Sequence, residues 1–524
     1  MAEGMSGSPP LEDIPELLHR IQMLLPVKEA ARTCVLSKSW LHAWSTIPTL
    51  RFLQATMSLR KEQETDHLKV IDHTLKNYLH NIIPIERIYL MIDTENQEYS
   101  SSLAEKWITS VATKSCLKQL SILIMVTSAS FSLPDDVLCG KNLTKLRVTG
   151  SFSKIHSLLM TTHPVINSLS LRQLHLKHVH VSEHVIHEIF STCKLLVDVE
   201  LFHCKGFDTI KIKNLGFLNN LQIDSYERNR ILEINQVPNL SFVWCVGNPL
   251  SVNMDSLEKV THLSFGDVFM DEAFLDMIKL KFPLLESLTL YMRLWSLESF
   301  HFTCASLKRL SLLGCSLRLI KVQVNAPKLH SFCFEGQTMP SLQFPASANS
   351  GLKKIKLGVY LSNPVDTSFF LKMRNALELS IEREIGITMT NIVILPPFEV
   401  DIINLRKMAK FPALDVKRLS FKTIGDEGLW ESSPFFDAFF TICHPKKIIA
   451  KPDKMFQHHN HFCKLMVREV MEKKNTGKVE EYLNWPYYLK GFEVKSEKEK
   501  SLPDGLRTSL DGSSRHSVFK LNWR

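Results

Sequence analysis

The chain has 524 residues, of which 44% are apolar and 22% charged, with a formal net charge of +9. A chain of this length is too long to fold around a single hydrophobic core, so two or more structural units or a repeat array are expected. No apolar run reaches the roughly 18 residues that are needed to span a bilayer. The first ten residues lack the features of a secretory leader, so we expect a nuclear and/or cytoplasmic protein. The eleven cysteines include no Cys-x-x-Cys pair, which indicates buried, reduced thiols rather than disulfides.

The first predicted elements are three short helices within residues 11–52. Asp13 and Glu16 resemble a capping box, and apolar residues then recur at helical spacing. Pro26 ends this helix, because the residue before a proline leaves the α region. A second helix-forming run precedes Ser37, which is the expected N-cap of the third helix. Such a small unit is marginal alone, so it either caps the rest of the chain or binds a partner.

The following segments repeat a leucine pattern. Three clear copies are LVDVELFHC (Leu196–Cys204), LSFVWCVGN (Leu240–Asn248) and LKRLSLLGC (Leu307–Cys315). They share the L-x-x-L-x-L-x-x-N/C signature of leucine-rich repeats, whose period is roughly 20–29 residues. Looser copies, which make eleven in all with starts 20 to 30 residues apart, begin at Leu117, Leu143, Ile166, Leu218, Val260, Leu285, Leu329 and Leu352. Further candidates begin at Ile85, Ala376 and Val416.

Each copy predicts a short strand whose fourth and sixth residues point to one side, because strand side chains alternate. One unit cannot bury that side alone, so neighbouring units stack into a solenoid with a continuous core. We therefore predict an α/β chain with an irregular leucine-rich array over residues 53–425. Such arrays bind other proteins through residues between the core positions. Candidates in two units are Val197, Asp198, Glu200, Lys308, Arg309 and Ser311.

The C-terminal part is expected to be a mixed α/β region over residues 426–494, followed by a disordered tail over residues 495–524 that mixes Ser, Lys, Glu and Gly. Residues 1–10 are also expected to be disordered. The run HHNHFC at 458–463, with Cys443 and His444 nearby, invites a zinc interpretation, but its ligands crowd together instead of forming two spaced pairs.

The sequence contains no phosphate-binding loop, dinucleotide fingerprint, zinc-protease motif or serine-hydrolase elbow. We therefore predict no catalytic residue, metal or cofactor. Residues 441–524 hold 17 Lys and Arg against 10 Asp and Glu, which leaves the rest of the chain near neutrality. A nucleic-acid face needs clustered cations with aromatic residues or a known motif, so neither a nucleic-acid nor a membrane partner is expected.

The N-terminal residues resemble the F-box, the adaptor-binding module of SCF-type ubiquitin ligases. The motif joins an apolar–Pro pair, a Leu-Leu step, an Ile, a Leu-Pro pair and a Val…Trp step. Its residues here are Ile14, Pro15, Leu17, Leu18, Ile21, Leu25, Pro26, Val35, Leu36 and Trp40. The chain departs from the family at Ser39, where a basic residue is usual, and at Gln22 and Met23. With the following array, it is similar to plant F-box proteins that carry leucine-rich repeats.

The resemblance implies a non-catalytic substrate-recognition subunit of a Skp–cullin–F-box ubiquitin ligase. The F-box would dock on a Skp-type adaptor and, through it, on a cullin–RING ligase. The array would hold a protein substrate for ubiquitination. The alternative is a leucine-rich-repeat interaction scaffold outside any ligase, in which the N-terminal helices only cap the array.

Overall fold

The computed structural model of the chain forms two compact units, Met1–Leu257 and Glu258–Arg524. No helix in the part of the chain that it describes is long and apolar enough to cross a membrane. The described residues are 14–25, 27–52, 61–93, 97–114, 116–125, 130–151, 157–160, 164–224, 231–246, 257–266, 270–293, 297–316, 318–344, 352–361, 365–389, 398–409, 412–423, 435–451, 489–498 and 515–523.

The predicted N-terminal helices form as α1 (Pro15–Leu24), α2 (Val27–Arg32) with the 3₁₀ turn η2 (Thr33–Val35), and α3 (Lys38–Ser45). Ser37 caps α3 as predicted, because its side chain accepts a hydrogen bond from the backbone N–H of Trp40. The predicted capping box involves Asp13, which lies outside the described residues. Ile14 is the N-cap residue of α1, and its side chain makes no capping hydrogen bond. Pro26 also lies outside them.

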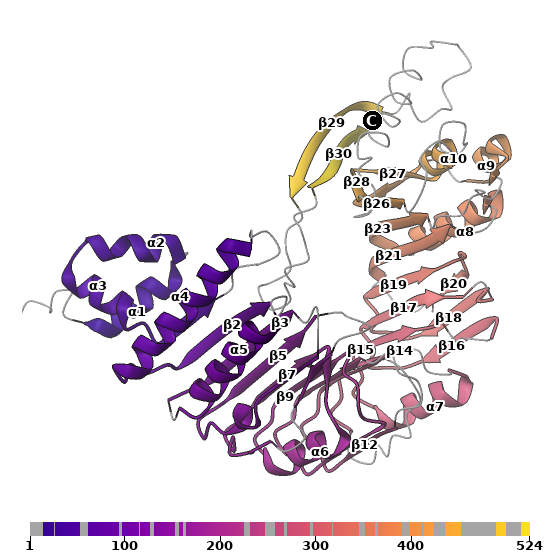
Figure 1. The fold of residues 1–524 in the computed structure, drawn as a ribbon. Helices are drawn as coiled ribbons and strands as arrows, with labels where there is room; N and C mark the ends of the chain where they lie inside the picture. Colours follow the sequence, from indigo (N-terminus) through magenta and orange to yellow (C-terminus); the bar gives the residue numbers. More distant parts are fainter. Residues whose placement is uncertain are drawn as a thin grey trace, which may run out of the picture. The chain divides into compact units, whose positions relative to one another are not determined.

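The first unit contains a ladder of parallel strands (Figure 1). Its strands, each paired in parallel with the next, are β1 (Thr49–Phe52), β2 (Arg87–Asp93), β3 (Gln119–Met125), β5 (Lys145–Gly150), β7 (Gln173–Lys177), β9 (Asp198–Phe202), β11 (Asn220–Asp224) and β13 (Phe242–Val246). The ladder begins immediately after the N-terminal helices, because the segment TLRF that follows Pro48 forms β1 and pairs with β2. The prediction of stacked strand units is confirmed.

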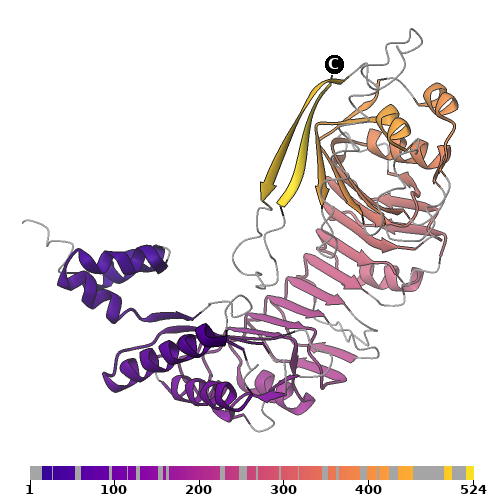
Figure 2. The same cartoon turned by 45° about the horizontal axis from the view of Figure 1, so that its top comes forward.

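The second unit repeats this arrangement and ends differently (Figure 2). Its parallel strands are β14 (His262–Gly266), β15 (Ser287–Tyr291), β17 (Arg309–Cys315), β19 (Ser331–Gly336), β21 (Leu352–Leu361), β23 (Ser380–Met389), β26 (Arg418–Thr423) and β28 (Lys447–Lys451). The parallel ladder therefore continues past residue 425, where the array was expected to end. Two antiparallel strands, β29 (Leu489–Lys498) and β30 (Arg515–Trp523), follow β28.

Helices and short strands return the chain between the ladder strands. The described return helices are α4 (Lys61–His80), α5 (Gln97–Ala112), α6 (Glu183–Thr192), α7 (Glu272–Lys281), α8 (Thr367–Glu378), α9 (Ile402–Met408) and α10 (Phe435–Ile442). Where no helix forms, small parallel sheets take their place, such as β10 (Thr209–Lys213) with β12 (Ile231–Asn235), and β16 (Ser299–Thr303) with β18 (Lys321–Asn325) and β20 (Ser341–Gln343). This mixture of return elements makes the solenoid irregular, as predicted.

The core lies between the ladder and its return elements. In β9 the residues alternate between partly exposed and buried, and the buried ones are Val199 and Leu201 at positions four and six of the repeat. Leu196 at position one is buried as well. Cys204 at position nine is buried in the turn, where its thiol contacts the carbonyl of Leu176 at 3.4 Å. The residue pattern thus identifies the core correctly in this unit.

Two predicted repeat starts are wrong. The copy placed at Ile166 should begin at Leu171, since β7 starts at Gln173 and its buried apolar residues are Leu174 and Leu176. The copy placed at Ala376 overlaps the end of α8, and its Ile381 is exposed on β23. Near Ile166 two overlapping stretches fit the same short pattern, and strand pairing with neighbouring repeats selects the second. At Ala376 the matching stretch forms the end of a helix, and the strand that pairs with β21 begins at Ser380 and does not fit the pattern.

The tail predicted to be disordered contains a strand over its last described residues. β30 pairs with both β28 and β29, and its Val518 and Leu521 are buried. Trp523 donates from Nε1 to the carbonyl oxygen of Pro445 at 2.8 Å. The prediction failed because composition alone does not show that an apolar alternation will find a partner strand elsewhere in the chain. Residues 499–514 of that tail lie outside the described part.

The stacked pair of His444 and Trp523 makes stability depend on pH. Their ring centroids lie 4.1 Å apart, and burial lowers the pKa of His444 to about 4. The unfolded chain takes up a proton near pH 6.5, whereas the folded imidazole stays neutral until the pH approaches 4. Stability from this residue is therefore complete above pH 6.5 and is lost as the pH falls toward 4, by at most about 3 kcal/mol.

We expect the thermal midpoint of the wild-type chain to fall between pH 7 and pH 4.5 more steeply than that of His444→Phe, which keeps an aromatic ring but cannot be protonated. His301→Phe is the matched control, because His301 is exposed on β16. Its pH profile should follow the wild type. Equal slopes for the wild type and His444→Phe would show that His444 carries no such dependence.

Candidate functional site

The three N-terminal helices enclose a very small core. Leu18 of α1 packs with Trp40 and Ala43 of α3, and the partly buried Ile21 lies against this cluster. Leu18 and Ile21, three residues apart on α1, both face this core, while Leu17 is exposed. A core of this size covers only part of the apolar surface of the three helices.

Gln22, one of the departures from the family motif, is buried in this core and cross-links the helices. Its Nε2 donates to the Thr33 hydroxyl at 2.9 Å and to the carbonyl oxygen of Trp40 at 3.1 Å. Thr33 in turn donates to the carbonyl oxygen of Ala30 at 2.6 Å. A polar residue therefore fixes α1 against η2 and α3 by directed hydrogen bonds.

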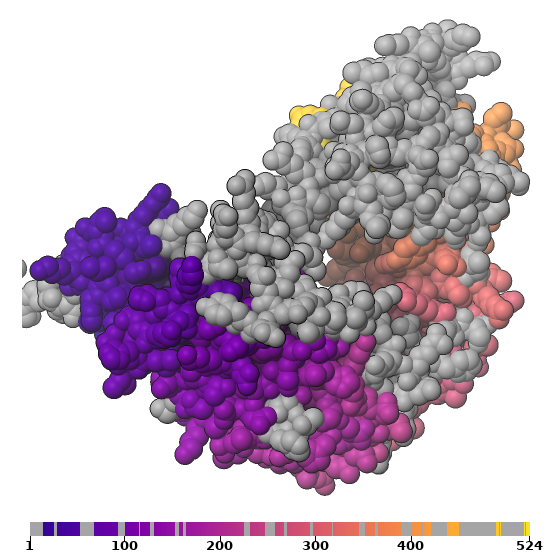
Figure 3. Space-filling view, in the orientation of Figure 1, coloured from indigo at the N-terminus to yellow at the C-terminus, as the bar shows by residue number. Residues whose placement is uncertain are grey.

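The N-terminal helices, which are indigo in Figure 3, have many exposed apolar side chains. The described residues of the whole chain include eighteen large, exposed apolar side chains, and six of them fall within this short segment. The six are Leu17, Leu24, Leu25, Val35, Leu36 and Leu41. Leu24, Val35 and Leu36 have 81%, 87% and 63% of their surface exposed. Such a concentration of apolar surface indicates a protein-binding site.

The predicted adaptor-binding residues divide into two groups in the structure. Pro15, Leu17, Leu25, Val35 and Leu36 are exposed, and Ile14 is partly exposed. Leu18 and Trp40 are buried in the core, and Ile21 is partly covered. Their hydrophobic character stabilises the helices that present the other residues. Pro26 is not among the described residues.

Two exposed leucines were missed by the sequence motif. Leu24 ends α1 seven residues after Leu17, which places both on the same side of the helix. Leu41 lies one residue after the buried Trp40 on α3. The helical spacing of Leu24 could have identified it, whereas Leu41 becomes evident only when the buried side of α3 is known.

The strand face of the first unit carries a polar network. His175 Nε2 lies 3.0 Å from Asp198 Oδ2, and Arg147 Nη2 lies 3.1 Å from His175 Nδ1. Asn220 donates to Asp198 Oδ1 at 2.6 Å. Burial alone would raise the pKa of the Asp198 carboxyl, but the hydrogen bonds from His175 and Asn220 outweigh it, and the pKa is lowered. Asp198, a predicted face residue, is therefore an ionised member of this network.

One group of potential metal ligands occurs in the same network. His175, Asp198 and Glu200 bring their ligand atoms within 4.8 Å of one another. The guanidinium of Arg147 occupies one side of His175, and both ring nitrogens already face a polar partner. The arrangement suits a hydrogen-bonded network better than a cation site. The histidines of 458–463 lie outside the described residues.

Comparison with known proteins relates the array to plant sequences. Residues 75–299 match the family described as At1g61320/AtMIF1, LRR domain. The Arabidopsis thaliana protein At3g49150, named as an F-box/LRR-repeat protein, is 26% identical over 196 residues, or 36% of this chain and 29% of the relative. F-box/LRR-repeat protein 25 of the same plant is 24% identical over 210 residues, or 40% of this chain and 73% of the relative.

A third relative from Arabidopsis thaliana, F-box/FBD/LRR-repeat protein At1g78750, is 22% identical over 218 residues, which cover 40% of this chain and 45% of the relative. The chain thus spans less than half the length of At3g49150 and of At1g78750.

Proposed function

The chain is a leucine-rich-repeat protein related to the plant F-box/LRR-repeat proteins, and on this premise we propose that it is the substrate-recognition subunit of a Skp–cullin–F-box ubiquitin ligase. The N-terminal helices dock on a Skp-type adaptor, which links them to a cullin–RING ligase. The array holds a protein substrate in the nucleus or the cytoplasm.

One observation carries this proposal: a helical unit with exposed apolar side chains directly precedes a ladder of parallel strands. The first part offers an apolar surface for one partner, and the second offers a long strand face for another. In such a receptor the chain performs no chemistry. It contributes proximity, because it holds the substrate where a conjugating enzyme that carries ubiquitin can reach the lysines of the substrate.

Co-purification with a Skp-type adaptor tests the proposal. The intact chain and the purified adaptor should co-elute from a size-exclusion column, as an established F-box protein does under the same conditions. If the intact, folded chain does not bind the adaptor while the established F-box protein does, the scaffold alternative explains the chain better.

A further inference from the structure

The strand face of the second unit, together with the edge where its strands begin, carries a group of cations that adaptor docking does not use. Lys353, Lys354 and Lys356 belong to β21, Lys417 immediately precedes β26, and Arg418 is its first residue. We call these five residues the cation cluster. β23 lies between the two strands, with Lys356 in register with Glu384 and Glu384 in register with Arg418.

A buried carboxylate holds part of the cation cluster in place. Glu384 Oε1 lies 3.3 Å from Lys354 Nζ, and its Oε2 lies 2.9 Å from Arg418 Nη2. The Glu384 side chain is 10% exposed, whereas those of Lys354 and Arg418 are 43% and 44% exposed. Burial would raise the pKa of Glu384, but the two cations outweigh it and the pKa is lowered. One ionised carboxylate thus positions two cations that stay open to solvent.

The cation cluster keeps a net positive charge. Lys417 lies 3.6 Å from Glu382, so two carboxylates, Glu382 and Glu384, form ion pairs with three of the five cations. Lys353 and Lys356 are exposed beside them. Excess charge of one sign on a fixed surface attracts an opposite charge from the partner.

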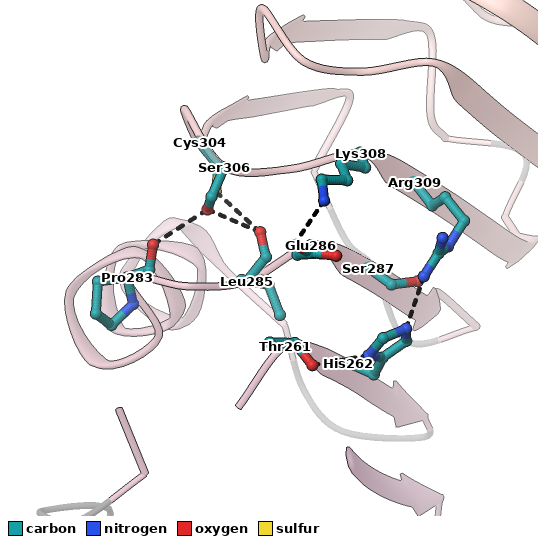
Figure 4. A network of polar contacts seen from close by, with 10 residues as sticks. All are labelled: Thr261, His262, Pro283, Leu285, Glu286, Ser287, Cys304, Ser306, Lys308 and Arg309. Atoms are coloured by element: carbon teal, nitrogen blue, oxygen red, sulfur yellow. Dashed lines mark hydrogen bonds and ion pairs between the residues drawn. The ribbon is translucent and has the colours of Figure 1, made fainter. Parts of the chain in front are cut away.

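The same mode of positioning recurs two strands earlier on the ladder (Figure 4). Lys308 Nζ lies 2.7 Å from Glu286 Oε1, and Arg309 Nη2 lies 2.6 Å from His262 Nε2. Lys308 is thus oriented by Glu286, which immediately precedes β15, and Arg309 by His262 of β14. Neighbouring strands are about 4.8 Å apart, so this pair lies about 10 Å from β21. The strand between them, β19, has Ser331, Cys333 and Glu335 on its partly exposed side. An extended ligand can therefore contact both groups of cations.

The composition of this face favours a polypeptide over a nucleic acid. Glu335, Glu382 and Glu384 are interspersed with the cations and would repel a continuous row of phosphates. Tyr360, the aromatic residue that β21 contributes to the face, donates its hydroxyl to Glu335. A face for single-stranded nucleic acid would combine cations with aromatic rings that are open for base stacking.

We propose that the cation cluster binds an acidic, Asp- and Glu-rich segment of the protein that the array recruits. The inference rests on the proposed function in calling that protein a substrate. The cations bind its acidic side chains, and the uncharged residues between those side chains lie opposite Glu382 and Glu384.

Fluorescence anisotropy with the full-length chain tests the inference. The probe is a labelled peptide of about 15 residues with alternating Glu and Ser, and the control probe has Gln in place of Glu. The Glu peptide should bind, the Gln peptide should not, and binding should weaken several-fold from about 50 to about 200 mM NaCl because salt screens exposed charges. Lys353→Glu with Lys356→Glu should weaken binding at least about tenfold.

The matched control is Lys211→Glu with Lys213→Glu, which reverses two exposed lysines on β10 and should change binding less than about twofold. Thermal midpoints of both double variants show whether each is folded. Equal binding of the Glu and Gln peptides, unchanged binding by the folded Lys353/Lys356 variant, or tighter binding of single-stranded DNA through these lysines would overturn the inference. Adaptor capture is measured separately, so loss of either activity identifies which proposal has failed.

Discussion

Replacing Val35 and Leu36 with Asp is expected to abolish adaptor capture while leaving the chain folded. These side chains are 87% and 63% exposed, so they contribute little to the helical core. Burial of each against a partner would contribute about 1.5–3 kcal/mol. Their joint loss therefore weakens the complex at least about 100-fold. The thermal midpoint should change little, since exposed substitutions usually alter stability by less than about 0.5 kcal/mol.

The control for this result replaces two other exposed apolar residues of the same unit. Val70→Asp with Ile82→Asp changes side chains on α4 and in the turn after it, neither of which belongs to the three N-terminal helices. This variant should retain adaptor capture in the same size-exclusion assay. If the Val35/Leu36 variant also retains it, the adaptor does not use this surface. The scaffold alternative predicts that neither variant loses a partner.

A core variant separates docking from folding. Trp40→Ala removes the largest side chain of the N-terminal core and would lose capture together with the structure of the three helices. The division between buried and exposed motif residues is therefore what makes the Val35/Leu36 experiment informative. From the motif alone both groups look equivalent, because all of its members are apolar or proline.

The regular part of the fold was predictable because its signal is local. Leu196, Val199 and Leu201 stand at fixed spacing, and each repeat buries the same positions. The wrong repeat start at Ile166 shows that the local pattern alone does not always fix which residue begins a repeat. INSLSL and LRQLHL fit the template equally well, and Ser168 of the first is buried in a turn, where its hydroxyl donates to the carbonyl oxygens of Leu138 and Gly140.

Features that depend on distant partners could not be predicted. β30 is a strand because β28 and β29 lie on either side of it, and nothing in the composition of the tail identifies these partners. The cation cluster is likewise dispersed in sequence between Lys353 and Arg418. Only the pairing of β21, β23 and β26 brings its members together around Glu384.

The largest expected change in stability from a single substitution concerns Arg374 on α8. Arginine is almost never fully buried, yet this side chain is buried and contacts three parts of the second unit. It donates to the carbonyl oxygens of Ile442 at 3.1 Å and Pro412 at 3.0 Å, and its Nε lies 3.3 Å from Glu378 Oε1. Burial lowers the pKa of the guanidinium, with Glu378 opposing this effect.

The bond to Ile442 explains why a cation is needed at this place. Ile442 is the last residue of α10, so its carbonyl is one of the groups that a helix leaves without an internal partner. A positive charge there also interacts favourably with the helix dipole. Arg374→Met keeps most of the apolar length and removes all three interactions. It should destabilise the chain by about 3–5 kcal/mol, because buried carbonyl groups lose their donors.

Thermal unfolding of the second unit measures this effect, and the midpoint should fall by roughly 10 °C. Lys407→Met on the neighbouring helix α9 is the matched control, because it removes one exposed cation with the same change of side chain. Its midpoint should stay near the wild-type value. Arg374→Lys keeps the charge but cannot reach both carbonyl groups with a planar fork, so it should recover only part of the loss. An unchanged midpoint for Arg374→Met would show that these carbonyl groups find other donors, and that α8 and α10 are held together by their apolar contacts alone.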